Sequence, residues 1–202
     1  MSQMFSQRAY GVLVPIVRAV LRILHPFTRI EGTENIPEGA AVLCANHSGL
    51  MDPVGILAFG RLGRLPRTMA KKELFTKKLL ARFFYKFGAF PVDRQGSDIT
   101  AIKIAFQTLK EGNKLLIFPE GTRIRKGKIS QAHSGANLIA NRMKAPLVPI
   151  YLSSNRFPFS PVKLIIGKAY YPHYEQAKPS AEELRAGADA LMERIYEMGE
   201  KA

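Results

Sequence analysis

The chain has 202 residues, of which 47% are hydrophobic, so it can bury one substantial core and we expect one folded domain. Its single cysteine excludes an intrachain disulfide framework and fits a reducing compartment. Thirty lysines and arginines against sixteen acidic residues give a formal net charge of +14, which favours partners that carry negative charge, such as phosphates, anionic lipid or nucleic acid.

Residues 1–30 contain no acidic residue. Their arginines are Arg8, Arg18, Arg22 and Arg29. On a helix these arginines lie on one side, opposite a broad apolar face, and the longest uncharged run is far shorter than the about 20 residues of a spanning helix. We therefore expect an amphipathic helix, or a helix pair divided at Pro15, in the headgroup layer of an anionic membrane. The alternative is a helix packed on the protein's own core, with its arginines in solvent.

Strands and helices alternate in the rest of the chain. Apolar or extended runs predict strands at Ala40–Ala45, Thr68–Ala70, Ala89–Val92, Lys114–Phe118, Leu147–Leu152 and Val162–Ile166. Helices are predicted from Asp52 as N-cap, at Leu74–Phe87, from Ser97 to Lys110, at Ser134–Met143, and after a capping box of Ser180 and Glu183. This order predicts an α/β fold, with one domain over residues 31–202 built on a mostly parallel central sheet flanked by helices.

Ligands of such sheets bind at the carboxyl ends of the strands, where the first loop runs from Asn46 to Asp52. His47 directly follows the buried strand, and Asp52 comes five residues later. A tight turn would bring the Asp52 carboxylate to one imidazole nitrogen and leave the other free as a general base. The spacing alone also allows Asp52 to be no more than a helix cap, and His47 to be a loop residue without chemistry.

Two further loops carry arginines at expected strand ends. Asp93-Arg94 follows Ala89–Val92, and Pro119-Glu-Gly-Thr-Arg123 follows Lys114–Phe118. An arginine at such a position can form a forked contact with a phosphate, and Gly121 lets the backbone turn sharply beside it. Each arginine by itself could equally be a solvated surface charge. Cys44 lies within an apolar run and is expected to be a core residue.

Four blocks occur in order along the chain. They are Asn46-His-x4-Asp52, Gly88-Ala-Phe-Pro-Val-Asp-Arg94, Phe118-Pro-Glu-Gly-Thr-Arg123 and Val148-Pro-Ile150. At these residues the chain resembles the glycerolipid acyltransferase family, in particular its short bacterial members that act on 1-acylglycerol-3-phosphate. The resemblance implies that His47 and Asp52 are catalytic. It also implies a substrate-binding set for the phosphate and glycerol of the acceptor, made up of Asn46, Arg94, Glu120, Gly121, Thr122 and Arg123.

The activity that this resemblance implies moves a fatty acyl group from acyl-CoA or acyl carrier protein to the sn-2 hydroxyl of 1-acyl-glycerol-3-phosphate (lysophosphatidic acid), giving phosphatidic acid. We expect a peripheral or monotopic protein on the cytoplasmic face of an anionic membrane, with no cofactor besides the thioester co-substrate. No metal is expected, because His-x4-Asp supplies only two ligands. No nucleic acid is expected, because the phenylalanines fall on apolar helix faces. The alternatives are a different lysolipid or glycerol-3-phosphate as acceptor, or a non-enzymatic basic protein that binds membranes or nucleic acid.

Overall fold

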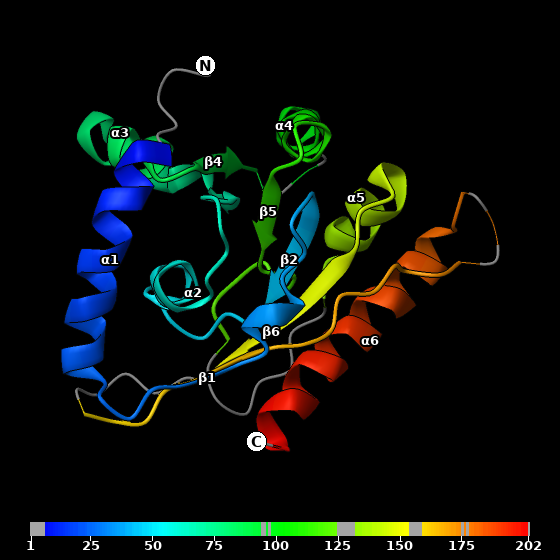
Figure 1. Ribbon diagram of the computed structural model, residues 1–202. Helices are drawn as coiled ribbons and strands as arrows, with labels where there is room; N and C mark the ends of the chain where they lie inside the picture. The colour runs from blue at the N-terminus through cyan, green and yellow to red at the C-terminus, as the bar shows by residue number, and fades with distance from the viewer. Residues whose placement is uncertain are drawn as a thin grey trace.

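In the residues that the structure describes, the alternating pattern builds a seven-stranded sheet with helices on both faces (Figure 1). The computed structural model describes residues 7–93, 96, 98–124, 132–153, 159–174, 176 and 178–201. The strands are β1 (Arg29–Glu31), β2 (Ala41–Ala45), β3 (Arg67–Lys71), β4 (Ala89–Val92), β5 (Lys114–Ile117), β6 (Leu147–Leu152) and β7 (Lys163–Ile166). The helices are α1 (Gln7–Leu24), α2 (Asp52–Phe59), α3 (Lys78–Lys86), α4 (Ile99–Lys110), α5 (Gly135–Met143) and α6 (Ala181–Glu200), with short 3-10 turns η2 (Thr33–Asn35) and η3 (Lys72–Phe75).

The sheet is mostly parallel, as predicted. Its strand order is β1-β7-β6-β2-β5-β3-β4, and β6, β2, β5, β3 and β4 all run in the same direction. Strand β7 pairs antiparallel with its neighbour β6, and β1 then runs parallel to β7. The carboxyl ends of β2, β5 and β6 therefore meet at one edge of the sheet.

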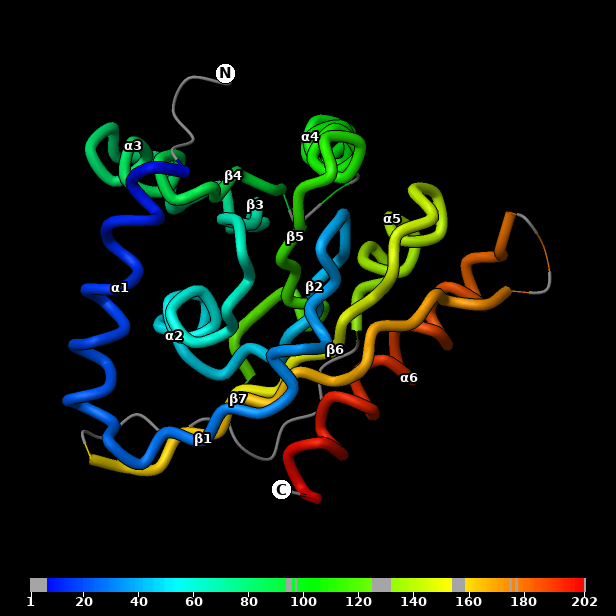
Figure 2. Tube along the Cα trace, viewed as in Figure 1, coloured from blue at the N-terminus to red at the C-terminus, as the bar shows by residue number. Residues whose placement is uncertain are grey.

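Strand β2 lies at the centre and is buried on both faces, which explains its unbroken apolar sequence. Val42 and Cys44 point into a core formed with α4, α5 and α6. Leu43 points the other way, into a core formed with α2 and the inner side of α1. Figure 2 shows these two groups of helices on opposite sides of the sheet. Burial raises the pKa of the Cys44 thiol, as expected for a core residue.

Several predicted element boundaries were wrong. The helix predicted at Leu74–Phe87 is divided into η3 and α3, because Phe75 folds back onto Phe84 and Tyr85, with ring centroids 5.6 and 4.9 Å apart. The apolar spacing is thus satisfied by packing across a turn. The side chain that caps α4 belongs to Asp98, which accepts from the amide of Ala101 at 2.9 Å, while Ser97 lies outside the described residues.

The structure also decides the predictions about Pro15, Asp52 and the capping box, and adds one strand. Helix α1 continues through Pro15, so the alternative of a helix pair was wrong within the described residues. Strand β1 was not predicted, since three residues are too few to form a pattern. Asp52 is the first residue of α2, and Met51 occupies the N-cap position without a side-chain cap. The capping box of Ser180 and Glu183 is confirmed, with hydrogen bonds of 3.1 and 2.7 Å.

Helix α1 packs on α2 in an orientation that its charge pattern did not predict. Arg18 donates to the carbonyl oxygen of Ala58 at 2.5 Å, and the Arg22 guanidinium lies over the ring of Phe59. The opposite side of the helix exposes apolar side chains; it consists of Val12, Leu13, Ile16, Val20, Ile23 and Leu24. Across the described ranges, no helix combines the length and the apolar character needed to cross a bilayer.

Candidate active site

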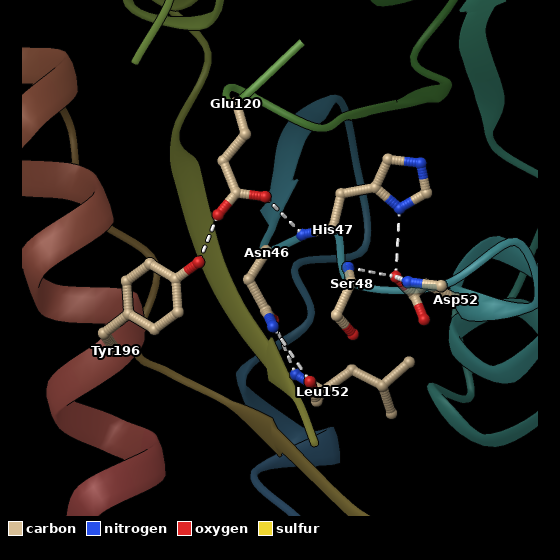
Figure 3. A network of polar contacts seen from close by, with 8 residues as sticks. Asn46, His47, Ser48, Asp52, Glu120, Leu152 and Tyr196 are labelled. Carbon is tan, nitrogen blue, oxygen red and sulfur yellow. Dashed lines mark hydrogen bonds and ion pairs between the residues drawn. The ribbon is translucent and has the colours of Figure 1, made fainter. Parts of the chain in front are cut away.

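The loop after β2 holds a histidine and an aspartate in direct contact. Nδ1 of His47 lies 2.9 Å from Oδ2 of Asp52 (Figure 3). Both side chains are largely buried, with 14% and 9% of their surfaces exposed. The same Asp52 oxygen accepts from the main-chain amides of Ser48 and Gly49, each at 2.6 Å. The carboxylate therefore reaches back over its own loop and holds the imidazole, instead of capping the helix that it starts.

The main chain of His47 is fixed as tightly as its ring. Its amide donates to Oε2 of Glu120 at 2.6 Å, and its carbonyl oxygen accepts from the amide of Ile124 at 2.8 Å. The imidazole also packs on Phe118, with ring centroids 4.4 Å apart. The loops after β2 and β5 thus hold each other, and the free ring nitrogen, Nε2, points away from Asp52 (Figure 3).

Asn46 fastens the same loop to the neighbouring strand β6. Its side-chain amide donates to the carbonyl oxygen of Leu152 at 2.9 Å and accepts from the Leu152 amide at 2.8 Å. These two hydrogen bonds continue the β2–β6 ladder beyond the end of β2, and Asn46 is almost fully buried. The polar atoms of Asn46 are therefore directed to main chain, although the sequence placed this residue among those that bind substrate.

Glu120 is also turned into the protein. The residue is only 3% exposed, and its second carboxylate oxygen, Oε1, accepts a hydrogen bond from the hydroxyl of Tyr196 on α6 (Figure 3). Burial raises the pKa of Glu120, against the lowering effect of the hydrogen bonds from Tyr196 and from the His47 amide. Sequence reasoning missed Tyr196. A tyrosine on an amphipathic helix signals nothing but packing, and this one lies beyond the four family-like blocks.

A cavity of about 650 Å³ opens beside His47. Its polar lining side chains belong to His47, Thr68, Lys71, Thr122 and Arg123, and Gly121 also lines it. The rest of the lining is mostly apolar; it includes Leu13, Val14 and Val17 of α1, Val54 and Leu57 of α2, Met69 of β3, and Phe83, Phe84 and Phe87. Such a lining accommodates a hydrocarbon chain beside the histidine. Arg94 lies outside the described residues.

A second cavity, of about 380 Å³, lies between α4 and α5 and shares Met69, Phe118 and Gly121 with the first. Gly121 has a φ of +63°, and a Cβ atom there would lie 2.5 Å from Nε2 of His133. Position 121 therefore requires glycine, both for its left-handed backbone and for the imidazole that packs against it.

In the parts of the chain that the structure describes, no cluster of His, Cys, Asp and Glu side chains could hold a metal ion.

The chain is similar to known acyltransferases in sequence and in fold. The sequence profile of the family described as Acyltransferase matches residues 27–153. A 1-acyl-sn-glycerol-3-phosphate acyltransferase of Bacillus subtilis (strain 168) is 37% identical over 188 residues, which cover 90% of this chain and 93% of that protein. A protein of the same description from Streptococcus pneumoniae (strain ATCC BAA-255 / R6) is 32% identical over 70% of this chain, which spans 53% of its length.

The fold has a counterpart among solved structures. The crystal structure of the 1-acyl-sn-glycerophosphate (LPA) acyltransferase PlsC from Thermotoga maritima superposes with a TM-score of 0.69 at 24% sequence identity, over 95% of this chain and 82% of that one. This likeness establishes the α/β architecture. Since the family profile covers more than half of the residues and the Bacillus relative matches nearly end to end, the chain belongs to the acyltransferase family and is an acyltransferase.

Proposed function

We propose that this acyltransferase transfers a fatty acyl group from an acyl thioester to the sn-2 hydroxyl of 1-acyl-glycerol-3-phosphate and so forms phosphatidic acid. The observation that carries the proposal is the His47–Asp52 pair, whose histidine lines a mostly apolar cavity that Arg123 also lines. To be acylated, a lipid hydroxyl beside a phosphate needs a base for its proton, a cation for the phosphate and an apolar space for the hydrocarbon chain. The printed descriptions of the relatives support this acceptor.

In the proposed mechanism His47 is the general base. Because Nδ1 is hydrogen-bonded to Asp52, Nε2 is left to accept the proton of the acceptor hydroxyl as its oxygen attacks the thioester carbonyl carbon. Asp52 keeps the ring in this tautomer and stabilises the imidazolium that forms. The tetrahedral intermediate then breaks its C–S bond and releases a thiolate.

The thiolate needs little assistance to leave, because its conjugate acid has a pKa of about 8.5. The imidazolium can return its proton to this thiolate or to water, which restores the enzyme for the next cycle. The acyl group passes directly to the acceptor oxygen, so the mechanism uses no covalent acyl-enzyme. The strongly basic chain suits either donor, since coenzyme A and acyl carrier protein are both acidic.

Arg123, with Gly121 and Thr122, is proposed to hold the acceptor phosphate. These residues line the same cavity as His47, and Arg123 is exposed. We propose Arg94 as a second contact, because it follows β4, whose carboxyl end faces the same edge of the sheet. Two guanidinium groups would bind a phosphate dianion through forked hydrogen bonds.

We propose that the protein works at the cytoplasmic surface of an anionic membrane. Support comes from α1, whose arginines Arg18 and Arg22 turn toward α2 while its apolar side faces outward, with Ile23 71% exposed. Helix α3 adds the exposed Leu79 and Phe83 between basic residues. Because both helices line the large cavity, an acyl chain could pass from the bilayer to the histidine without crossing water.

An acyl-transfer assay tests the proposal directly. The purified protein is given lysophosphatidic acid with acyl-CoA or with acyl carrier protein, and phosphatidic acid is identified as the product. Glycerol-3-phosphate and lysophosphatidylcholine serve as competing acceptors. We expect lysophosphatidic acid to be acylated at least about tenfold faster than either competitor, because each competitor lacks either the acyl chain or the exposed phosphate that the cavity matches. Faster acylation of glycerol-3-phosphate would contradict the acceptor assignment.

A further inference from the structure

The C-terminal helix α6 is connected to the loop of His47 through one buried carboxylate. Glu120 accepts from the His47 amide with one oxygen and from the Tyr196 hydroxyl with the other. Among the residues described, Glu120 lines neither of the two cavities, so its side chain is directed to protein donors and not to ligand space. Tyr196 lies outside residues 27–153, the part that matches the family profile.

The hydrogen bond at the His47 amide bears directly on the position of the imidazole. The peptide unit before the His47 Cα is held by Glu120, and the one after it is held by Ile124. With both units fixed, only the two side-chain torsions of His47 remain, and Asp52 restrains those. A displacement of about 1 Å at a reacting group can reduce a rate about 10²-fold, so this scaffold matters for the chemical step.

We propose that Tyr196 is a positioning residue for acyl transfer, which acts through Glu120 to hold the main chain of His47, and that Glu120 serves the histidine and not the acceptor. The inference rests on the proposed role of His47 as the base. It differs from the role that family resemblance implies for Glu120, which is contact with the glycerol and phosphate of the acceptor.

The Tyr196 hydroxyl is suited to this role because a buried carboxylate needs donors for both of its oxygens. Without the hydroxyl, Oε1 of Glu120 loses its donor from α6, and burial then favours either protonation or rotation of the side chain toward solvent. Either change weakens the acceptor of the His47 amide. Tyr196 is 40% exposed, so removal of the hydroxyl oxygen alone, with the ring kept, is a small change in packing.

The first test is Tyr196→Phe, which removes one oxygen and keeps the ring. We expect kcat to fall about tenfold, since a hydrogen bond to a charged group is lost, while KM for lysophosphatidic acid and for the thioester stays within about twofold. The matched control is Tyr174→Phe. It removes a hydroxyl that accepts from Asn137 at 3.0 Å, close to Gly187 of α6 but unconnected to His47, and should leave kcat unchanged.

A double-mutant cycle with Glu120→Gln decides whether Tyr196 acts through Glu120. Glutamine can accept from the His47 amide and donate to the Tyr196 oxygen, so it keeps the geometry and removes the charge. If the path runs through Glu120, Tyr196→Phe should change kcat less than about twofold in the Glu120→Gln background. An equal tenfold loss in both backgrounds would overturn the proposal, as would a wild-type kcat for Tyr196→Phe.

A separate result would contradict the proposed role of Glu120. If Glu120→Gln raises KM for lysophosphatidic acid and leaves kcat intact, Glu120 is an acceptor ligand and the inference is wrong. His47→Ala separates this failure from that of the proposed function. Inactive His47→Ala with fully active Tyr196→Phe refutes only the inference, whereas active His47→Ala refutes the base assignment and the inference together.

Discussion

Asp52 holds His47 from within the same loop, with 2.9 Å between Oδ2 of the aspartate and Nδ1 of the histidine. That oxygen also accepts from the amides of Ser48 and Gly49, so the loop is folded around the carboxylate. The Asp52 carboxylate therefore binds both the main chain of its own loop and the imidazole ring. Because of these two roles, different substitutions of Asp52 should affect activity and stability differently.

Replacing His47 by alanine should abolish acyl transfer, because Nε2 is the proposed proton acceptor. We expect kcat to fall at least about 10²-fold, with thermal unfolding and vesicle binding close to those of the wild type. His173→Ala, on an exposed loop, serves as the control and should remain fully active. Near wild-type turnover by His47→Ala would refute the mechanism.

Asp52→Asn should lose activity and keep its stability. The amide oxygen can still accept from Ser48 and Gly49, but the charge that stabilises the imidazolium is gone, so we expect kcat to fall at least about 10²-fold. Asp52→Ala should lose activity as well and also destabilise the fold by about 1–3 kcal/mol, because the amides of Ser48 and Gly49 lose their acceptor. Kinetics together with urea unfolding distinguish the two variants. An active Asp52→Asn would leave the carboxylate with a structural role only.

Arg123→Ala should weaken acceptor binding more than donor binding. Loss of a charge-assisted contact to phosphate is expected to raise KM for lysophosphatidic acid about tenfold or more. Lysine at this position should rescue poorly, because it lacks the planar fork. We expect a similar but smaller effect for Arg94→Ala, and no effect for Arg185→Ala on the exposed side of α6. A selective rise in KM for the thioester would instead assign these arginines to the donor.

Single glutamates on the outer side of α1 should release the protein from membranes. Val20→Glu or Ile23→Glu introduces a charge on the exposed apolar side and keeps the packing of α1 on α2. We expect binding to anionic vesicles to fall about tenfold and to weaken further with salt. Lys103→Ala on α4 lowers the net charge by the same amount on the other side of the sheet. Equal loss by this control in co-sedimentation would mean that net charge alone drives binding.

Glu120→Gln should alter the pH dependence of stability. Burial raises the folded-state pKa of Glu120 above its ordinary 4.5, so the folded protein holds this proton more tightly than the unfolded chain does. Wild-type stability from this group is therefore present at low pH and is lost as pH rises from 4.5 through the folded pKa. Glutamine does not titrate, so the variant should gain free energy of unfolding relative to wild type over that window. Urea unfolding on both sides of it provides the measurement, and a difference independent of pH would contradict the prediction.

The central fold was predictable because burial on both faces demands continuous apolar strands. The apolar sequences of β2 and β5 predicted buried strands for this reason, and the strand at Leu147–Leu152 was predicted with the bounds that the structure shows. The division of Leu74–Phe87 was not predictable, since apolar spacing is the same whether a segment continues as a helix or folds back on one. The outward direction of the apolar side of α1 also depended on packing against α2.

The chemical groups at the strand ends could be predicted from the sequence, because chain order places His47, Asp52, Glu120 and Arg123 after β2 and β5. The contacts that each polar atom makes depend on how the elements pack. The Asp52 carboxylate could have capped a helix, and instead it holds a ring. Glu120 could have faced a ligand, and instead it joins His47 to Tyr196. Tyr196 lies 76 positions after Glu120 in the chain. A hydrogen bond between distant residues depends on the packing of α6 against the sheet, and no local pattern encodes that arrangement.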